Sequence, residues 1–216
     1  MRFKHKKHGG RLTQNKWISR SITLVAVILF ASGLYLLVLV LTPNVPVLYP
    51  IEKIDIAALP GPKEDRIYIP KIGVNVELLT GGAEVLDQGA WHRYPERGDP
   101  VEGGNFIVSA HRFSLGVTPG KTRQKSPFYH INKLEVGDQI IVDSAGKRYG
   151  YEITKHTEVK PDQVEIEAPL ADNEDPHMTL YTCTFKGESD GREVYFAKPL
   201  GEVIDGNVQV PKPSLK

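Results

Sequence analysis

Residues 177–185 have the sequence HMTLYTCTF, an apolar and β-branched run that predicts a buried strand. The run contains Cys183, the only cysteine in the 216-residue chain. A single cysteine cannot form an intramolecular disulfide, so the core alone must hold the fold. Cys183 lies near the end of the strand, beside the polar stretch KGESDG. It is therefore either a small hydrophobe in the core or a reactive thiol beside a cleft.

Short β-type runs lie on both sides of this strand. EVYFA (193–197) follows it, NFIVSA (105–110) precedes it, and residues 139–159 predict a hairpin with SAGK as its turn. RIYI and VNVELL are two earlier strands. Helical signal is limited to a turn or two at 82–90 and at 126–134. Many short strands without alternating helices predict an all-β fold with short helices, a closed or nearly closed β-barrel.

The N-terminal end differs in composition from the rest of the chain. Residues 1–20 contain seven of the 27 Lys and Arg residues and no acid, whereas the remainder has 20 basic against 26 acidic residues. Residues 21–41 carry no charge, and as a helix rising about 1.5 Å per residue they would cross a bilayer's hydrocarbon core. The alternative is a signal peptide cleaved near residues 31–33. We expect an uncleaved, single-pass anchor that contacts membrane lipid, with a cytoplasmic N-terminus and an extracellular body.

Composition also divides the remainder of the chain. Residues 42–63 hold five prolines and predict an extended spacer. Residues 64–203 hold the strands and predict a single domain, and residues 204–216 predict a polar tail. The basic residues of the N-terminus are better explained as a topology signal than as a nucleic-acid site, so we expect no nucleic-acid partner.

Two further residues favour a reactive role for Cys183. His111 follows the strand NFIVSA, and Arg192 opens the strand after the cysteine. A histidine can activate a thiol and later protonate a leaving amine. An arginine cannot act as a base at ordinary pH, but it can hold a carbonyl or the oxyanion that develops from it. Each residue alone is weak evidence, because strand-end histidines and arginines are often structural or solvated.

The motifs around these residues resemble the sortases, membrane-anchored cysteine transpeptidases of mainly Gram-positive surfaces. TLYTC is preceded by SAHR and followed by GREVYFA. RIYIPKIGVNVEL, PVEGGNFIVSAHR and SPFYHINKLEVGDQIIV are similar to family segments in the same order, as is VKPDQVEI before the cysteine strand. The resemblance covers about residues 64–203. Other cysteine acyl-transfer families fit worse, because the order here is His then Cys and the cysteine lies in a strand.

The resemblance implies a fold and a site. The fold would be the sortase-type eight-stranded β-barrel behind one transmembrane helix. Cys183 would be the nucleophile, His111 the catalytic histidine and Arg192 the catalytic arginine, with Ala110 and Thr182 contacting substrate. Ala110 departs from the family, in which a glycine usually precedes the histidine.

The resemblance also implies a reaction and partners. The enzyme would cleave an LPXTG-like sorting signal at the C-terminus of a surface protein through a thioester. It would then transfer the protein to an amine on a wall precursor or a pilin lysine. With no second span and no obvious lid motif, the chain does not match a typical pilus-polymerising class C member. A non-catalytic, membrane-tethered binding module on the same barrel is the alternative function.

The sequence predicts no cofactor. His92, His130, His156 and His177 lack metal-ligand spacing with one another or with Cys183, so we expect no zinc site. In some sortases the loop that corresponds to residues 161–176 binds calcium. For this acidic loop, calcium binding is an alternative to a plain solvated surface.

Overall fold

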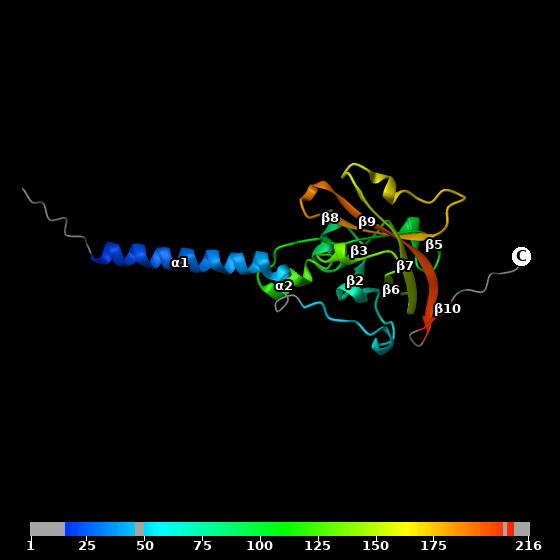
Figure 1. The fold of residues 1–216 in the computed structure, drawn as a ribbon, viewed down its shortest axis with the longest axis horizontal. Coiled ribbons are helices and arrows are strands. Elements are labelled where there is room, and N and C mark those ends of the chain that lie inside the picture. Colours follow the sequence, from blue (N-terminus) through cyan, green and yellow to red (C-terminus); the bar gives the residue numbers. More distant parts are fainter. Residues whose placement is uncertain (1–15, 46–49, 205–206, 210–216) are drawn as a thin grey trace, which may run out of the picture. The chain divides into compact units, whose positions relative to one another are not determined.

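The computed structural model describes residues 16–45, 50–204 and 207–209. The chain divides into two compact units, residues 1–38 and 39–216, and the barrel belongs to the second. Within the described residues, one helix is long and apolar enough to cross a membrane. This helix is α1 (Lys16–Leu41), which includes the predicted span 21–41 and starts five residues before it (Figure 1).

Eight strands close into a mixed β-barrel in the order β9-β7-β6-β1-β2-β3-β5-β8, and β8 returns to pair with β9. These strands are β1 (Arg66–Ile69), β2 (Val74–Leu79), β3 (Ala90–Arg93), β5 (Gly103–Ser109), β6 (Gln139–Ser144), β7 (Lys147–Val159), β8 (His177–Thr184) and β9 (Gly187–Ile204). The pairs β2–β3 and β5–β8 are parallel and the other barrel pairs are antiparallel. The predicted eight-stranded barrel is confirmed (Figure 1).

Short elements complete the described fold. Strand β4 (Gly98–Asp99) pairs with β5, and β10 (Asn207–Gln209) pairs with β9. Helix α2 spans Pro119–Gln124. The 3-10 turns are Thr42–Asn44, Ile56–Ala58, Pro70–Ile72, Ala83–Asp87, Pro95–Arg97, Ile131–Lys133 and Val164–Glu167. Two of these turns fall within the two regions predicted to have short helices, whereas α2 was not predicted. Its signal is Thr118, which caps the helix by accepting from the Lys121 amide, followed by proline at the first helical position.

The strand that carries Cys183 is apolar because both of its faces are covered. Met178 and Leu180 point into the main core of the barrel, where they are fully buried. Tyr181 belongs to a second cluster with Ile107 and Val194 on the other face. A strand buried on both faces shows a continuous apolar run instead of alternation.

The segment predicted as an extended spacer, residues 42–63, packs against the barrel over part of its length. Ile54, Ile56 and Leu59 lie against a buried cluster that contains Tyr68. The prediction was wrong for this part. The prolines indicated an extended segment, but its apolar residues pack against the surface of the barrel.

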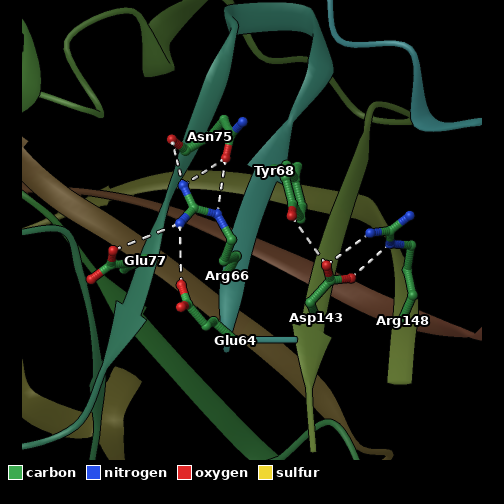
Figure 2. Close-up of polar contacts among 7 residues, drawn as sticks. All are labelled: Glu64, Arg66, Tyr68, Asn75, Glu77, Asp143 and Arg148. Carbon is green, nitrogen blue, oxygen red and sulfur yellow. Dashed lines mark hydrogen bonds and ion pairs between the residues drawn. The ribbon is translucent and has the colours of Figure 1, made fainter. Parts of the chain in front are cut away.

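A buried polar network beside Tyr68 holds the end of this segment. The Arg148 guanidinium donates to both carboxylate oxygens of Asp143, at 2.6 and 2.8 Å, and to the carbonyl of Pro60 at 2.7 Å. The Tyr68 hydroxyl donates to the same carboxylate at 3.1 Å. Figure 2 shows the contacts of Asp143 with Tyr68 and Arg148, which run from β1 through β6 to β7, next to a second group in which Arg66 binds Asn75. The network ties Pro60 to the hairpin of β6 and β7.

The C-terminal prediction needs a correction as well. The predicted tail 204–216 contains Asn207–Gln209, which forms strand β10, and β9 continues to Ile204 instead of ending near the predicted strand EVYFA. The sequence did not predict this extension, because Pro199 and Gly201 are residue types that normally interrupt strands. A register shift between β7 and β9 near Gly150 accommodates them. Residues 205–206 and 210–216 of the predicted tail, like residues 1–15 of the predicted basic tail, lie outside the described residues.

Candidate active site

The parallel pairing of β5 with β8 brings two predicted site segments together. The register aligns Ser109, the last residue of β5, with Tyr181 of β8. One residue further, the Thr182 hydroxyl donates to the Ala110 carbonyl at 2.7 Å, so the alignment continues beyond the ladder. The next residue on each strand is His111 on one side and Cys183 on the other. Ala110 and Thr182 are both buried and hold this junction together.

The antiparallel pairing of β8 with β9 places Arg192 on the other side of the cysteine. Cys183 and Arg192 are direct cross-strand partners, just before a register shift. Directly opposite residues of an antiparallel pair project from the same face of the sheet. The Arg192 guanidinium donates to the carbonyls of Glu188, at 2.7 Å, and Gly191, at 3.1 Å. These two bonds come from one nitrogen, Nη1, so the fork retains donors for a further partner.

The Cys183 thiol lies in a partly buried position. Burial raises the pKa of the thiol, because desolvation penalises the thiolate. The positive charge of Arg192 opposes this rise, and the negative charge of Glu188 adds to it. The thiol form is therefore favoured at neutral pH, more so than for a free cysteine.

The His111 imidazole is shifted in the opposite direction. Burial lowers its pKa, and the nearby charges of Asp87 and Glu188 partly restore it, while Lys125 lowers it further. Asp87 Oδ1 lies 3.6 Å from His111 Nε2, and its other oxygen lies 2.9 Å from Lys125 Nζ. A raised thiol pKa and a lowered imidazole pKa both favour the neutral pair over the thiolate–imidazolium pair.

A second arginine lies beside the site with its charge neutralised. Arg112, the residue after His111, is 3 % exposed and forms an ion pair with Glu193, the neighbour of Arg192. The Tyr195 hydroxyl donates to the same carboxylate at 2.9 Å. The Arg112 guanidinium also covers the ring of Phe185 at 3.7 Å. This pair cross-links the ends of β5 and β9 behind the candidate site.

The acidic loop before β8 does not gather ligands for calcium. Glu167 lies 2.9 Å from the Arg93 guanidinium and also accepts from the Tyr181 hydroxyl, so its carboxylate is already paired. Across the described residues, which include all of 161–176, no group of three or more His, Cys, Asp or Glu could hold a metal ion. The loop therefore does not fit the calcium alternative, and we derive no step through a metal.

The sequence did not identify the charged neighbours of His111. Asp87 comes from the 3-10 turn Ala83–Asp87, Lys125 follows α2, and Glu188 lies at the start of β9. None has a motif of its own. The one available signal was the short helix expected at 82–90, because Asp87 lies within that region.

The fold agrees with comparisons to known proteins. The Sortase domain family matches residues 67–200, and the chain belongs to the sortase family. It is 30 % identical over 156 residues to Sortase SrtE1 of Streptomyces coelicolor, which covers 66 % of this chain and 42 % of that protein. The chain thus spans less than half the length of this curated relative.

Two solved structures lead to the same family. Sortase E1 from Streptomyces coelicolor, with a tripeptide in its active site, has a TM-score of 0.53 at 28 % identity and covers 64 % of this chain and 88 % of that one. A Clostridium perfringens Sortase D5 transpeptidase has a TM-score of 0.52 at 28 % identity, covering 64 % and 79 %. The expectation of a sortase outside the typical class C group is consistent with the curated match to a sortase E1.

Proposed function

We propose that this chain is a cysteine transpeptidase that uses Cys183, His111 and Arg192. The observation that carries the proposal is the position of Cys183 between two neighbours. Arg192 is its direct cross-strand partner on β9, and on the other side Thr182, the residue before Cys183, donates to the carbonyl of Ala110, the residue before His111. Together, these three residues would supply a nucleophile, a proton carrier and an oxyanion donor.

The proposed reaction has two acyl transfers. The Cys183 thiolate attacks the carbonyl carbon of the Thr–Gly bond in an LPXTG-like sorting signal, and Arg192 donates hydrogen bonds to the oxyanion. The C–N bond then breaks as the His111 imidazolium protonates the leaving amine, which leaves a thioester on Cys183. An acceptor amine on a wall precursor or a pilin lysine attacks the thioester, returns a proton to His111 and releases the thiolate.

The opposed shifts at the two groups predict slow turnover. With unperturbed pKa values near 8.5 and 6.5, roughly 1 % of the molecules would hold the ion pair. The raised pKa of Cys183 and the lowered pKa of His111 make that fraction smaller. We expect a bell-shaped profile of kcat/KM whose limbs lie further apart than those two values. Its acid limb would fall below pH 6.5, and its alkaline limb would lie above that of a free thiol.

The proposed location rests on α1. We propose that this helix anchors the chain in the cell membrane with the N-terminus in the cytoplasm and the barrel outside, where surface proteins and wall amines meet it. Substrates would then be surface proteins that carry a C-terminal sorting signal.

The test uses the full chain in detergent micelles, incubated with a panel of sorting-signal peptides and a soluble amine. We expect cleavage at the Thr–Gly bond, an amine-linked product, and an intact mass increase equal to the acyl fragment on Cys183. Cys183→Ala should be folded and show no cleavage and no adduct. Peptide binding without cleavage by the unmodified chain would instead identify a membrane-tethered binding module.

A further inference from the structure

We propose that Asp87 is a positioning residue for His111 and that Lys125 controls how strongly Asp87 acts on the imidazole. The proposal rests on the proposed function, since it concerns the histidine of that site. It adds a carboxylate and an ammonium group to a site in which the sequence indicated only a cysteine, a histidine and an arginine.

The geometry of Asp87 supports this role. Its two carboxylate oxygens face different cations: Oδ1 lies 3.6 Å from His111 Nε2, and Oδ2 lies 2.9 Å from Lys125 Nζ. One carboxylate therefore bridges the imidazole and the ammonium group. The contact involves Nε2, which leaves the other ring nitrogen, Nδ1, outside it. A carboxylate on one ring nitrogen fixes the orientation and the tautomer of an imidazole.

The three groups come from separate parts of the fold. Asp87 ends the 3-10 turn Ala83–Asp87, His111 follows β5, and Lys125 caps the end of α2. Because Asp87 is half exposed and His111 one third exposed, solvent weakens this interaction. Asp87 would therefore hold the ring in place and adjust its protonation by a modest amount.

The other charges around His111 come from the two strands beside it. Glu188, at the start of β9, raises the pKa of His111 together with Asp87, whereas Lys125 lowers it. Cys183 on β8 pairs with Arg192 on β9, whose charge acts on the thiol. Asp87 and Lys125 therefore act on the imidazole with opposite signs. Removing the charge of Asp87 should lower the pKa of His111, and removing the charge of Lys125 should raise it.

Asp87→Asn tests the carboxylate. It keeps the shape and removes the charge, so the pKa of His111 should fall by roughly half a unit and the acid limb of kcat/KM should move down with it. If the ion pair is the active form, kcat/KM on the plateau should fall about threefold through kcat, with KM unchanged. Asp87→Glu, which keeps the charge, should restore most of the His111 pKa and most of kcat/KM.

Lys125→Met tests the ammonium group. It should raise the pKa of His111 and move the acid limb upward, because Asp87 is then no longer shared. Two controls match the charge changes. Glu84→Gln lies on the same turn but faces the Gly82 amide, and Lys121→Met lies on α2 but binds Gln124. Neither control should move the pKa of His111.

The pKa is measured on the full chain in micelles by NMR of histidine-labelled protein, with the His111 signal assigned by its loss in His111→Asn. This measurement does not depend on turnover. Opposite shifts in the two variants support the proposal even if no peptide is cleaved, in which case only the proposed function fails. If the wild type cleaves peptides but Asp87→Asn leaves both the pKa and the acid limb unchanged, the positioning role is wrong and the proposed function stands.

Discussion

Arg112 and Arg192 lie at the same end of the barrel, but their surroundings differ. Arg112 is 3 % exposed and forms an ion pair with the buried carboxylate of Glu193. Arg192 is partly exposed and, in the part of the chain that the structure describes, its hydrogen bonds go only to the backbone carbonyls of Glu188 and Gly191. A guanidinium whose charge is already neutralised can brace the fold. One that is partly exposed and not paired with a carboxylate can receive an oxyanion.

The largest expected effect separates the two arginines by stability. Arg112→Met leaves Glu193 buried without its cation, which should cost about 3–5 kcal/mol of unfolding free energy. For a chain of this size the unfolding midpoint should fall by roughly 10 °C. Near-UV circular dichroism of the full chain in micelles follows the aromatic residues of the barrel and measures this midpoint.

A double variant sharpens the same test. Arg112→Met combined with Glu193→Gln removes both charges, so much of the lost stability should return. If the double variant is as unstable as the sum of the two single variants, Arg112 and Glu193 do not act as a pair.

The next effect separates the arginines by activity. Arg192→Lys keeps the charge but loses the planar fork of donors, so kcat/KM for peptide cleavage should fall on the order of 100-fold. The unfolding midpoint should stay within about 1 °C of the wild type, since no carboxylate among the described residues is paired with Arg192. Near-normal cleavage by this variant would make Arg192 a bystander and remove the basis of the comparison.

The smallest effect concerns the aromatic ring over Arg112. Phe185→Leu removes the cation–π contact at 3.7 Å and keeps most of the apolar surface. Because Phe185 is 58 % exposed, we expect a loss of about 1 kcal/mol and a shift of roughly 3 °C in the midpoint. A much larger loss would show that Phe185 is part of the core that Arg112 supports.

The sequence predicted the two neighbouring strands that carry Cys183 and Arg192. Cys183 and Arg192 belong to one hairpin, and an apolar strand followed by a polar turn and another apolar strand indicates such a pair directly. His111 was proposed from its place after the strand NFIVSA and from the resemblance, whereas the parallel pairing of β5 with β8 has no local signal.

The partners of charged side chains could not be predicted from the sequence. Arg112 and Arg192 both stand next to a predicted strand, and no sequence pattern says that Glu193 would neutralise the first and leave the second. Asp87 reaches His111 only because a 3-10 turn and the end of β5 meet in space. The packing of apolar residues in the predicted spacer was likewise not predictable, because it depends on the barrel surface that they cover.

The parallel pairing of β5 with β8 also has a consequence for how the chain folds during synthesis. The junction joins Ala110 to Thr182 across 72 positions, whereas the hairpin that carries Cys183 and Arg192 is local. Closing a long loop comes late, because its entropic cost must be met before the distant contact forms. During synthesis, the strand before His111 is therefore made earlier than the strand that carries Cys183. A chain that stalls before β8 carries no thiol at all, and the site is completed only in the step that closes the barrel.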